Sequence, residues 1–135
     1  MANRNDQLPR GTSFTTPDLV KEYLCAKAAG LEHEVFVALW LNTRHQLIEY
    51  EELFRGTIDA TAIFPREVVK AALGRNAAAV IFAHNHPSGN ATPSAEDRNI
   101  TARLKQALTL VDVRVLDHVV IGGTTMASMA ELGCL

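Results

Sequence analysis

Residues 80–97 have the sequence VIFAHNHPSGNATPSAED, and the first part of this stretch predicts a buried strand. Residues 80–83 are all apolar, and His84 and His86 follow one residue apart. Because side chains alternate between the two faces of a strand, both histidines are expected on the same face, with Cα atoms about 6–7 Å apart. The strand would therefore carry two imidazole rings to one point, while Asn85 would point away from it.

The second part of the stretch predicts a helix that returns to the same point. Thr92 is expected as the N-cap and Pro93 at the first helical position, so that Asp97 lies near the start of the helix. Ser94 precedes Asp97 by three residues and shares its face. Two histidines and one carboxylate, with a fourth position open to water, form a catalytic type of zinc site. Such a site also needs a general base beside the water, and a glutamate from a neighbouring strand would serve.

The whole sequence predicts a single domain over residues 14–135, preceded by a flexible arm over residues 1–13. Helices are expected at residues 16–30, 64–74 and 92–110, and strands at 35–41, 46–55, 77–84, 113–121 and 124–129, with residues 57–63 continuing the sheet or its edge. Runs that are apolar on both faces favour central strands. The predicted fold class is therefore α/β, with a curved mixed β-sheet flanked by helices.

Composition and charge argue against several classes of function. The 135 residues carry a net charge of −2, and no basic stripe supports binding to nucleic acid. No run of about 18 apolar residues is present to span a membrane, and the N-terminus lacks the apolar core of a secretion signal. Cys25 and Cys134 form no CxxC pair and are expected to be reduced, with Cys25 an inert, half-buried thiol. A cytoplasmic protein is therefore expected, and the oligomeric state stays open.

The residues of the predicted zinc site resemble a known metalloprotease motif. His84-x-His86 with Pro87 directly after it, followed by Ser94-x-x-Asp97, is similar to the motif of the JAB/MPN+ (JAMM) family. Four longer segments resemble the bacterial RadC-like branch of that family: FPREVVK (64–70), NAAAV (76–80), HNHPSG (84–89) and VLDHVV (115–120). The resemblance extends from about residue 14 to residue 135. It matches the short, single-domain form, without the helix-hairpin-helix region often found ahead of the domain, and it implies the JAB/MPN architecture, which is cytidine deaminase-like.

This resemblance implies a zinc-dependent metallopeptidase or isopeptidase, which hydrolyses an amide bond of a peptide or protein substrate with a metal-activated water. One Zn²⁺ ion would be bound by His84, His86 and Asp97. Ser94 would stabilise the oxyanion of the tetrahedral intermediate alongside the metal. The catalytic glutamate of the family stands at the start of an early strand, just before an apolar run, and Glu34 matches that position.

Several residues in this interpretation have alternatives. Glu32 is the nearest competitor for the role of base, and three glutamates on the return strand are weaker candidates: Glu49, Glu51 and Glu52. Ser94-x-x-Asp97 taken alone is also typical of a capping box, a purely structural helix start. Asp117 and His118 face opposite ways on a strand, so they cannot bind one ion together, and either could support the site or serve the core or the surface.

The competing class of function is a non-enzymatic interaction module, which keeps a metal site for stability and is associated with DNA repair or mobile-element biology. A zinc deaminase is a poorer match, because it would need His-x-Glu and a later Cys-x-x-Cys pair. A two-metal hydrolase would need Asp and His at the positions of Ser88 and Gly89. Intact ligands and a candidate base favour the hydrolase with one zinc ion.

Overall fold

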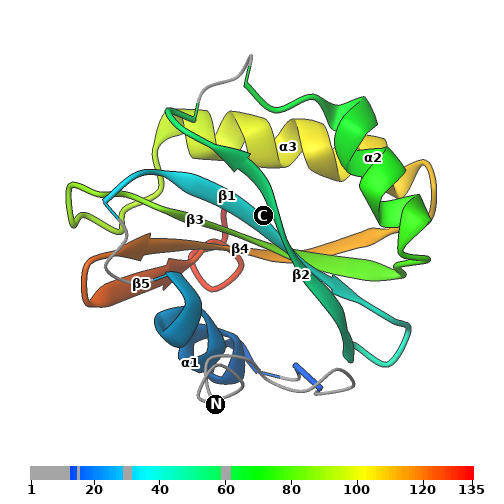
Figure 1. Ribbon diagram of the computed structural model, residues 1–135, viewed down its shortest axis with the longest axis horizontal. Coiled ribbons are helices and arrows are strands. Elements are labelled where there is room, and N and C mark those ends of the chain that lie inside the picture. The colour runs from blue at the N-terminus through cyan, green and yellow to red at the C-terminus, as the bar shows by residue number, and fades with distance from the viewer. Residues whose placement is uncertain (1–12, 15, 29–31, 59–61) are drawn as a thin grey trace.

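The computed structural model describes residues 13–14, 16–28, 32–58 and 62–135, which form one five-stranded sheet with helices on both faces (Figure 1). The elements along the chain are α1 (Pro17–Ala28), β1 (Val35–Leu41), β2 (Leu47–Arg55), α2 (Pro65–Gly74), β3 (Ala79–Asn85), α3 (Ala95–Thr109), β4 (Arg114–Gly122) and β5 (Thr125–Ser128). The strand order is β2-β1-β3-β4-β5. Only β3 and β4 pair in parallel, and the other neighbours are antiparallel. The predicted mixed sheet of an α/β fold is confirmed.

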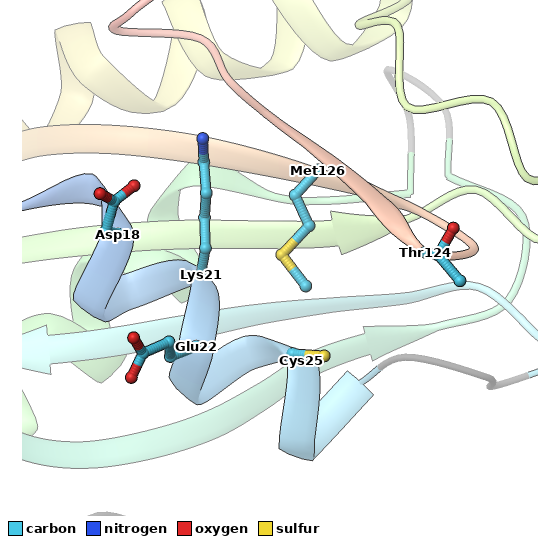
Figure 2. A pocket seen from close by; sticks show the side chains of 6 residues that line it. All are labelled: Asp18, Lys21, Glu22, Cys25, Thr124 and Met126. Carbon is cyan, nitrogen blue, oxygen red and sulfur yellow. The ribbon is translucent and has the colours of Figure 1, made fainter.

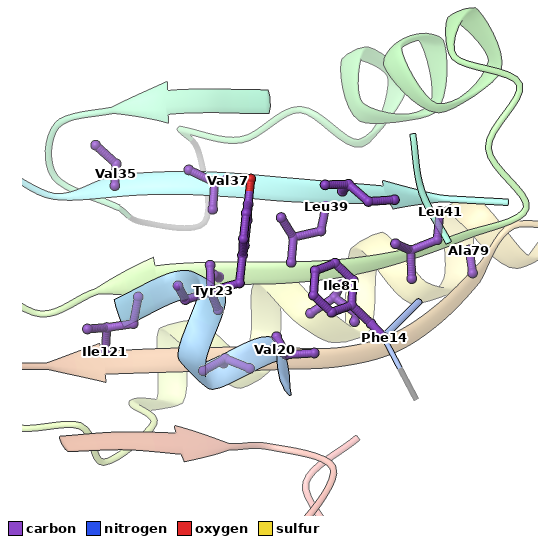
Figure 3. Packing of buried hydrophobic residues seen from close by; sticks show 14 residues of the cluster. Phe14, Val20, Tyr23, Val35, Val37, Leu39, Leu41, Ala79, Ile81 and Ile121 are labelled. Carbon is purple, nitrogen blue, oxygen red and sulfur yellow. The ribbon is translucent and has the colours of Figure 1, made fainter. Parts of the chain in front are cut away.

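The central strands are buried on both faces because helices cover both sides of the sheet. α1 packs on one face, and α2 and α3 lie together on the other (Figure 1). Alternate residues of β1 therefore enter different cores: Val37 and Leu39 face α1, whereas Phe36 and Trp40 face α2 and α3. In Figure 3, side chains from α1 lie against the apolar residues of β1 and β3. This double cover explains why β1 and β3 are continuous apolar runs in the sequence.

The β3–α3–β4 connection places the candidate site at the carboxyl end of β3. His84 is the next-to-last residue of β3, and His86 is the first residue after the strand. The chain then loops back through residues 87–94 and enters α3, which packs on the same face of the sheet as the side chain of Phe82. The start of α3 consequently lies beside the end of β3.

The helix α3 begins two residues later than the sequence suggested. Ser94 is its N-cap, and Thr92 is not. The N–H of Thr92 instead donates to Asn90 Oδ1 at 2.9 Å, so Thr92 belongs to the turn before the helix. The predicted N-cap role of Thr92 was therefore wrong, although the helix itself was correctly predicted.

Residues 57–63 do not continue the sheet where the structure describes them. Gly56 has φ +120° and its N–H donates to Glu34 O at 2.9 Å, which ends the pairing of β2. Residues 57, 58, 62 and 63 lie outside any strand, and residues 59–61 are outside the described residues. Ile58 and Ile63 are nevertheless buried in the core beneath α2 and α3, so their apolar character reflects packing of a loop.

Other parts of the chain follow the predicted elements. The strands expected at residues 35–41 and 46–55 are present and pair as a hairpin, and β5 pairs with β4. In α2, Val68 and Ala72 are buried, whereas Leu73 is 55% exposed. The predicted arm lies outside the described residues except for Ser13, which pairs with Gln46 in an isolated bridge. Within the parts of the chain that the structure describes, no helix is long and apolar enough to cross a membrane.

Candidate metal centre

The structure brings His84, His86 and Asp97 together at the end of β3. Asp97 Oδ1 lies 2.9 Å from His84 Nδ1, and Asp97 Oδ2 lies 3.1 Å from His86 Nε2. His84 and Asp97 are only 3% and 1% exposed. One possible ligand atom from each residue lies within 4.8 Å of the other two. Among the described residues, this is the only such group of three or more His, Cys, Asp and Glu side chains.

The donor set and its geometry fit a zinc ion. Two imidazole nitrogens and a carboxylate oxygen are typical zinc ligands, and ligand atoms in a tetrahedral site lie about 3.3 Å apart when each is about 2.0–2.1 Å from the metal. The contacts of 2.9 and 3.1 Å are close to this separation. His84 Nδ1 is buried and has no hydrogen-bond partner, because its contact with Asp97 lacks the direction of a hydrogen bond. An ion between these groups would satisfy that nitrogen.

A backbone carbonyl fixes the ring of His86. His86 Nδ1 lies 2.7 Å from Asn90 O, and a carbonyl can only accept, so Nδ1 carries the proton. In the neutral ring, Nε2 then presents a lone pair to Asp97 Oδ2, 3.1 Å away. Two lone pairs at that distance repel unless a proton or a metal cation lies between them. A histidine whose second nitrogen donates to a carbonyl is the usual arrangement at metal sites.

Asp97 holds the start of α3 and faces the histidines with the same carboxylate. The N–H of Ser94 donates to Asp97 Oδ2 at 2.7 Å, and the N–H of Asp97 donates to Ser94 Oγ at 3.0 Å. This is a capping box. The structural interpretation of Ser94-x-x-Asp97 and the metal-site interpretation were weighed as alternatives, but the structure contains both arrangements at once.

Charges around His84 are unbalanced in favour of negative groups. Burial alone would lower the pKa of His84, but close contacts with the carboxylates of Asp97 and Glu34 outweigh burial and raise it above its usual value. Burial likewise opposes ionisation of Asp97, yet the contact with His84 and the N–H of Ser94 hold the pKa of this carboxyl well below its usual range. The cluster therefore favours a positive charge at its centre.

Glu34 is the glutamate that the structure places beside the histidines. It directly precedes β1, and its Oε2 lies 3.0 Å from His84 Nε2. Its Oε1 accepts a hydrogen bond of 3.3 Å from the N–H of Ile58. Glu32, the nearest competitor in the sequence, is exposed and precedes the strand.

The glutamates of β2 are engaged elsewhere. Glu49 and Glu51 both contact the guanidinium of Arg75, at 3.4 and 3.0 Å. Glu52 pairs with Arg55 at 2.9 Å. These contacts direct the three carboxylates toward cations of the protein itself.

Thr101 was not assigned a role from the sequence, and the role of His118 was left open. His118 is fully buried on the face of the sheet that carries His84, and the two ring centroids are 6.1 Å apart. Thr101 Oγ1 donates to Asp97 O at 2.6 Å and lies 2.6 Å from His118 Nδ1. Because the hydroxyl has one proton, His118 Nδ1–H must donate to Thr101. Burial, followed by repulsion from His84, lowers the pKa of His118 to about 3.

Asp117 faces the opposite way from its neighbour, as the alternation along a strand predicts. It accepts hydrogen bonds from Ser128 Oγ and from the N–H of Ala130, so it fixes the turn after β5. A histidine at an inward-facing position of a strand could have identified His118 in the sequence. Thr101 offers no such signal, because a threonine in a helix is common.

A separate groove lies on the other face of the sheet, between α1 and the β4–β5 turn (Figure 2). It is lined by Asp18, Lys21, Glu22, Cys25, Thr124 and Met126. Cys25 is exposed there, so the expectation of a half-buried thiol was wrong. The reason is that α1 turns Val20, Tyr23 and Leu24 toward the sheet, which leaves Cys25 on its outer side.

Comparison with known families assigns the chain independently of this geometry. The model of the RadC-like JAB domain matches residues 14–134. The chain belongs to the RadC-like JAB family. Two relatives in Vibrio cholerae, each named UPF0758 protein, are 60% identical to it over 126 residues, or 93% of this chain and 79% and 80% of those proteins. A UPF0758 protein of Polaromonas is 54% identical over 130 residues, which cover 96% of this chain and 58% of that protein. This RadC-like JAB domain is thus shared with relatives of different length.

Proposed function

We propose that this RadC-like JAB domain is a zinc-dependent metallopeptidase or isopeptidase, which hydrolyses an amide bond of a peptide or protein substrate. The observation that carries the proposal is that His84, His86 and Asp97 lie together while a fourth side chain, Glu34, contacts the ring of His84. Three ligands with a free fourth position are typical of catalytic zinc sites, whereas structural sites use four protein ligands.

The chain supplies a base and a hydrogen-bond donor on either side of the ligands. When bound, zinc supplies Lewis acidity to a water molecule and to the scissile carbonyl. Glu34 is held at Oε1 by the N–H of Ile58, and its Oε2 lies 3.0 Å from His84 Nε2. This second oxygen is thereby kept beside the proposed ligands, where it would take a proton from water and pass it to the leaving amine. Ser94 Oγ accepts from the N–H of Asp97, so its own O–H remains available to the developing oxyanion.

Metal content tests the proposed ligands. Elemental analysis of the purified wild type is expected to give one zinc per chain, and His84→Ala is expected to lose it. His33→Ala is the matched control, because His33 is an exposed histidine just outside β1. Equal zinc in the wild type and His84→Ala would refute the ligand assignment.

Hydrolysis tests the proposed reaction separately. Cleavage of a panel of fluorogenic peptides, including one with an isopeptide bond to lysine, is expected for the wild type. Glu34→Gln should retain zinc and lose cleavage, since an amide keeps the shape of the side chain but cannot take up the proton. Zinc bound without cleavage of any probe, together with a salt-dependent shift of DNA, would instead favour the non-enzymatic module.

A further inference from the structure

Asn85 lies between the two histidines but projects to the opposite face of β3. It is 4% exposed, and both ends of its amide are bonded to the backbone at the start of β1. Oδ1 accepts from the N–H of Val35 at 2.7 Å, and Nδ2 donates to His33 O at 2.9 Å. A side chain excluded from the metal cluster by strand alternation therefore has two partners of its own.

These two hydrogen bonds bracket Glu34. His33 and Val35 are its neighbours in the chain, so the Asn85 amide holds the backbone on both sides of the proposed base. The backbone register of β1 with β3 runs from Leu41–Ala79 to Phe36–His84. The side chain of Asn85 thus continues the ladder at the end where Glu34 lies. On the other side, the N–H of Gly56 donates to Glu34 O at 2.9 Å.

We propose that Asn85 is a positioning residue, which holds the Glu34 carboxylate beside the metal ligands; this rests on the role of Glu34 in the proposed function. The chemistry of the position requires one donor and one acceptor on a short side chain, which a primary amide provides. The end of β3 would therefore carry the two proposed histidine ligands on one face and Asn85, which supports the proposed base, on the other face. Ligand placement and base placement are therefore linked by three consecutive residues.

Amide hydrogen exchange tests the positioning in the metal-free protein. The N–H of Val35 reports the bond to Asn85, and the N–H of Ile58 reports whether the Glu34 carboxylate is in place. In Asn85→Ala, exchange at both amides is expected to accelerate by about tenfold or more, because the net stabilisation by one hydrogen bond corresponds to about a tenfold change in the opening equilibrium. Loss of protection at Val35 alone, with Ile58 unchanged, would overturn the proposal.

A control at the other end of β1 separates positioning from general loss of stability. Asn42 Oδ1 accepts from the N–H groups of Arg44 and Gln46, so it clamps the hairpin far from Glu34. Asn42→Ala should accelerate exchange at these two amides and leave Ile58 unchanged. If Asn85→Ala does not fold, Asn85→Asp replaces it: the acceptor for Val35 remains, but a carboxylate oxygen faces His33 O. Faster exchange at Ile58 is then expected, and unchanged exchange would refute the proposal.

Kinetics give a second test, in which failure of the Asn85 proposal can be distinguished from failure of the proposed function. With the fluorogenic peptides, Asn85→Ala should keep its zinc and its KM, while kcat falls by about 100-fold, as expected for a misplaced base. Asn42→Ala should keep kcat. Loss of zinc in Asn85→Ala would overturn the proposal, because the residue would then support the ligands. If the wild type cleaves nothing, the proposed reaction fails, and the exchange at Ile58 alone decides the positioning.

Discussion

Replacement of Gly122 by alanine is expected to weaken metal binding, although Gly122 is not one of the proposed metal ligands. Gly122 is the last residue of β4, and the loop after His86 crosses directly over it. A Cβ atom there would lie 2.6 Å from Asn90 C and 2.8 Å from Gly89 O, and it would also meet the backbone N of Ala91. All three obstructing atoms belong to the backbone, so no side chain can turn aside to make room.

The size of the effect follows from these distances. Asn90 C must move by about 0.8 Å to reach the 3.4 Å at which ordinary contact begins. Asn90 O holds His86 Nδ1 at 2.7 Å, so a shift of this size is sufficient to exceed the hydrogen-bond range, which ends near 3.2 Å. Loss of such a supporting bond typically lowers metal affinity by about 10- to 100-fold. The corresponding change in binding free energy is about 1.4–2.8 kcal/mol.

The assay is competition for zinc against a chromophoric chelator, with circular dichroism to verify folding. Gly123→Ala is the matched control, since a Cβ there would lie 3.7 Å from Gly89 Cα, an ordinary contact. Its φ of +61° means that alanine costs about 1–2 kcal/mol of stability, but the loop need not move. If folded Gly122→Ala binds zinc as tightly as the wild type, or if Gly123→Ala weakens binding equally, the loop does not orient His86.

Three further predictions concern the residues around Asp97. Asp97→Asn keeps an oxygen for the N–H of Ser94 but removes the negative charge, so zinc should be lost in elemental analysis while the melting temperature of the metal-free protein changes less than in Asp97→Ala. Thr101→Val leaves the buried Nδ1–H of His118 without its acceptor and removes the hydrogen bond to Asp97 O. It should lower the free energy of unfolding in urea by about 1–3 kcal/mol, with Thr101→Ser as the control. Because the pKa of His118 is lowered to about 3, the unfolded chain binds a proton here below pH 6.5 that the folded protein does not. This contribution to stability is complete above pH 6.5 and should fall by about 2 kcal/mol between pH 6.5 and 5 in metal-free protein, but not in His118→Gln.

Each of these predictions has a contradicting result. Zinc retained in Asp97→Asn would remove Asp97 from the ligands. Equal unfolding free energies for Thr101→Val and Thr101→Ser would mean that the hydroxyl is not needed. An identical pH dependence of stability in the wild type and His118→Gln would mean that folding does not lower the pKa of His118.

The sheet could be predicted from the sequence because its signals are local. β1 and β3 are apolar runs, and their covering helices have apolar residues at helical spacing, so element types follow from neighbouring residues. The positions of His84 and His86 on one face follow from the same alternation. Residues 57, 58, 62 and 63 were misassigned for a related reason. Ile58 and Ile63 are apolar because they pack on the core, and apolar character alone does not distinguish such loop residues from an edge strand.

The start of α3 shows where local signals conflict. Thr92-Pro93 and Ser94-x-x-Asp97 are two helix-start patterns that overlap in the sequence, and each is sufficient alone. The tertiary contacts favour the second, because Asn90 engages the N–H of Thr92 in a turn and Asp97 must reach the histidines. The local preference of Thr92-Pro93 for a helix start is outweighed by the buried carboxylate of Asp97, which has several partners when the helix starts at Ser94.

The supports of the site could not be found from sequence because their partners are distant. Asn85 bonds to a strand start 50 residues earlier, and Thr101 meets His118 across 17 residues. No sequence pattern identifies Asn85 or Thr101 as a support, because the role of each depends on which distant strand or helix packs beside it. The proposed ligands, in contrast, lie within 14 consecutive positions and form a recognisable motif.

Asp97 shows why helix and site depend on each other. Its Oδ2 accepts from the N–H of Ser94 and faces His86, while Oδ1 faces His84. Its backbone carbonyl is bonded to Thr101, which holds His118 in turn. The carboxylate is therefore fixed by the fold of α3 before any metal arrives, and the entropy of ordering this ligand is already lost on folding. A metal ion bound by the proposed ligands would meet a carboxylate that is already oriented. Its binding would stabilise the first turn of α3, because the ion and the cap would hold the same carboxylate in place.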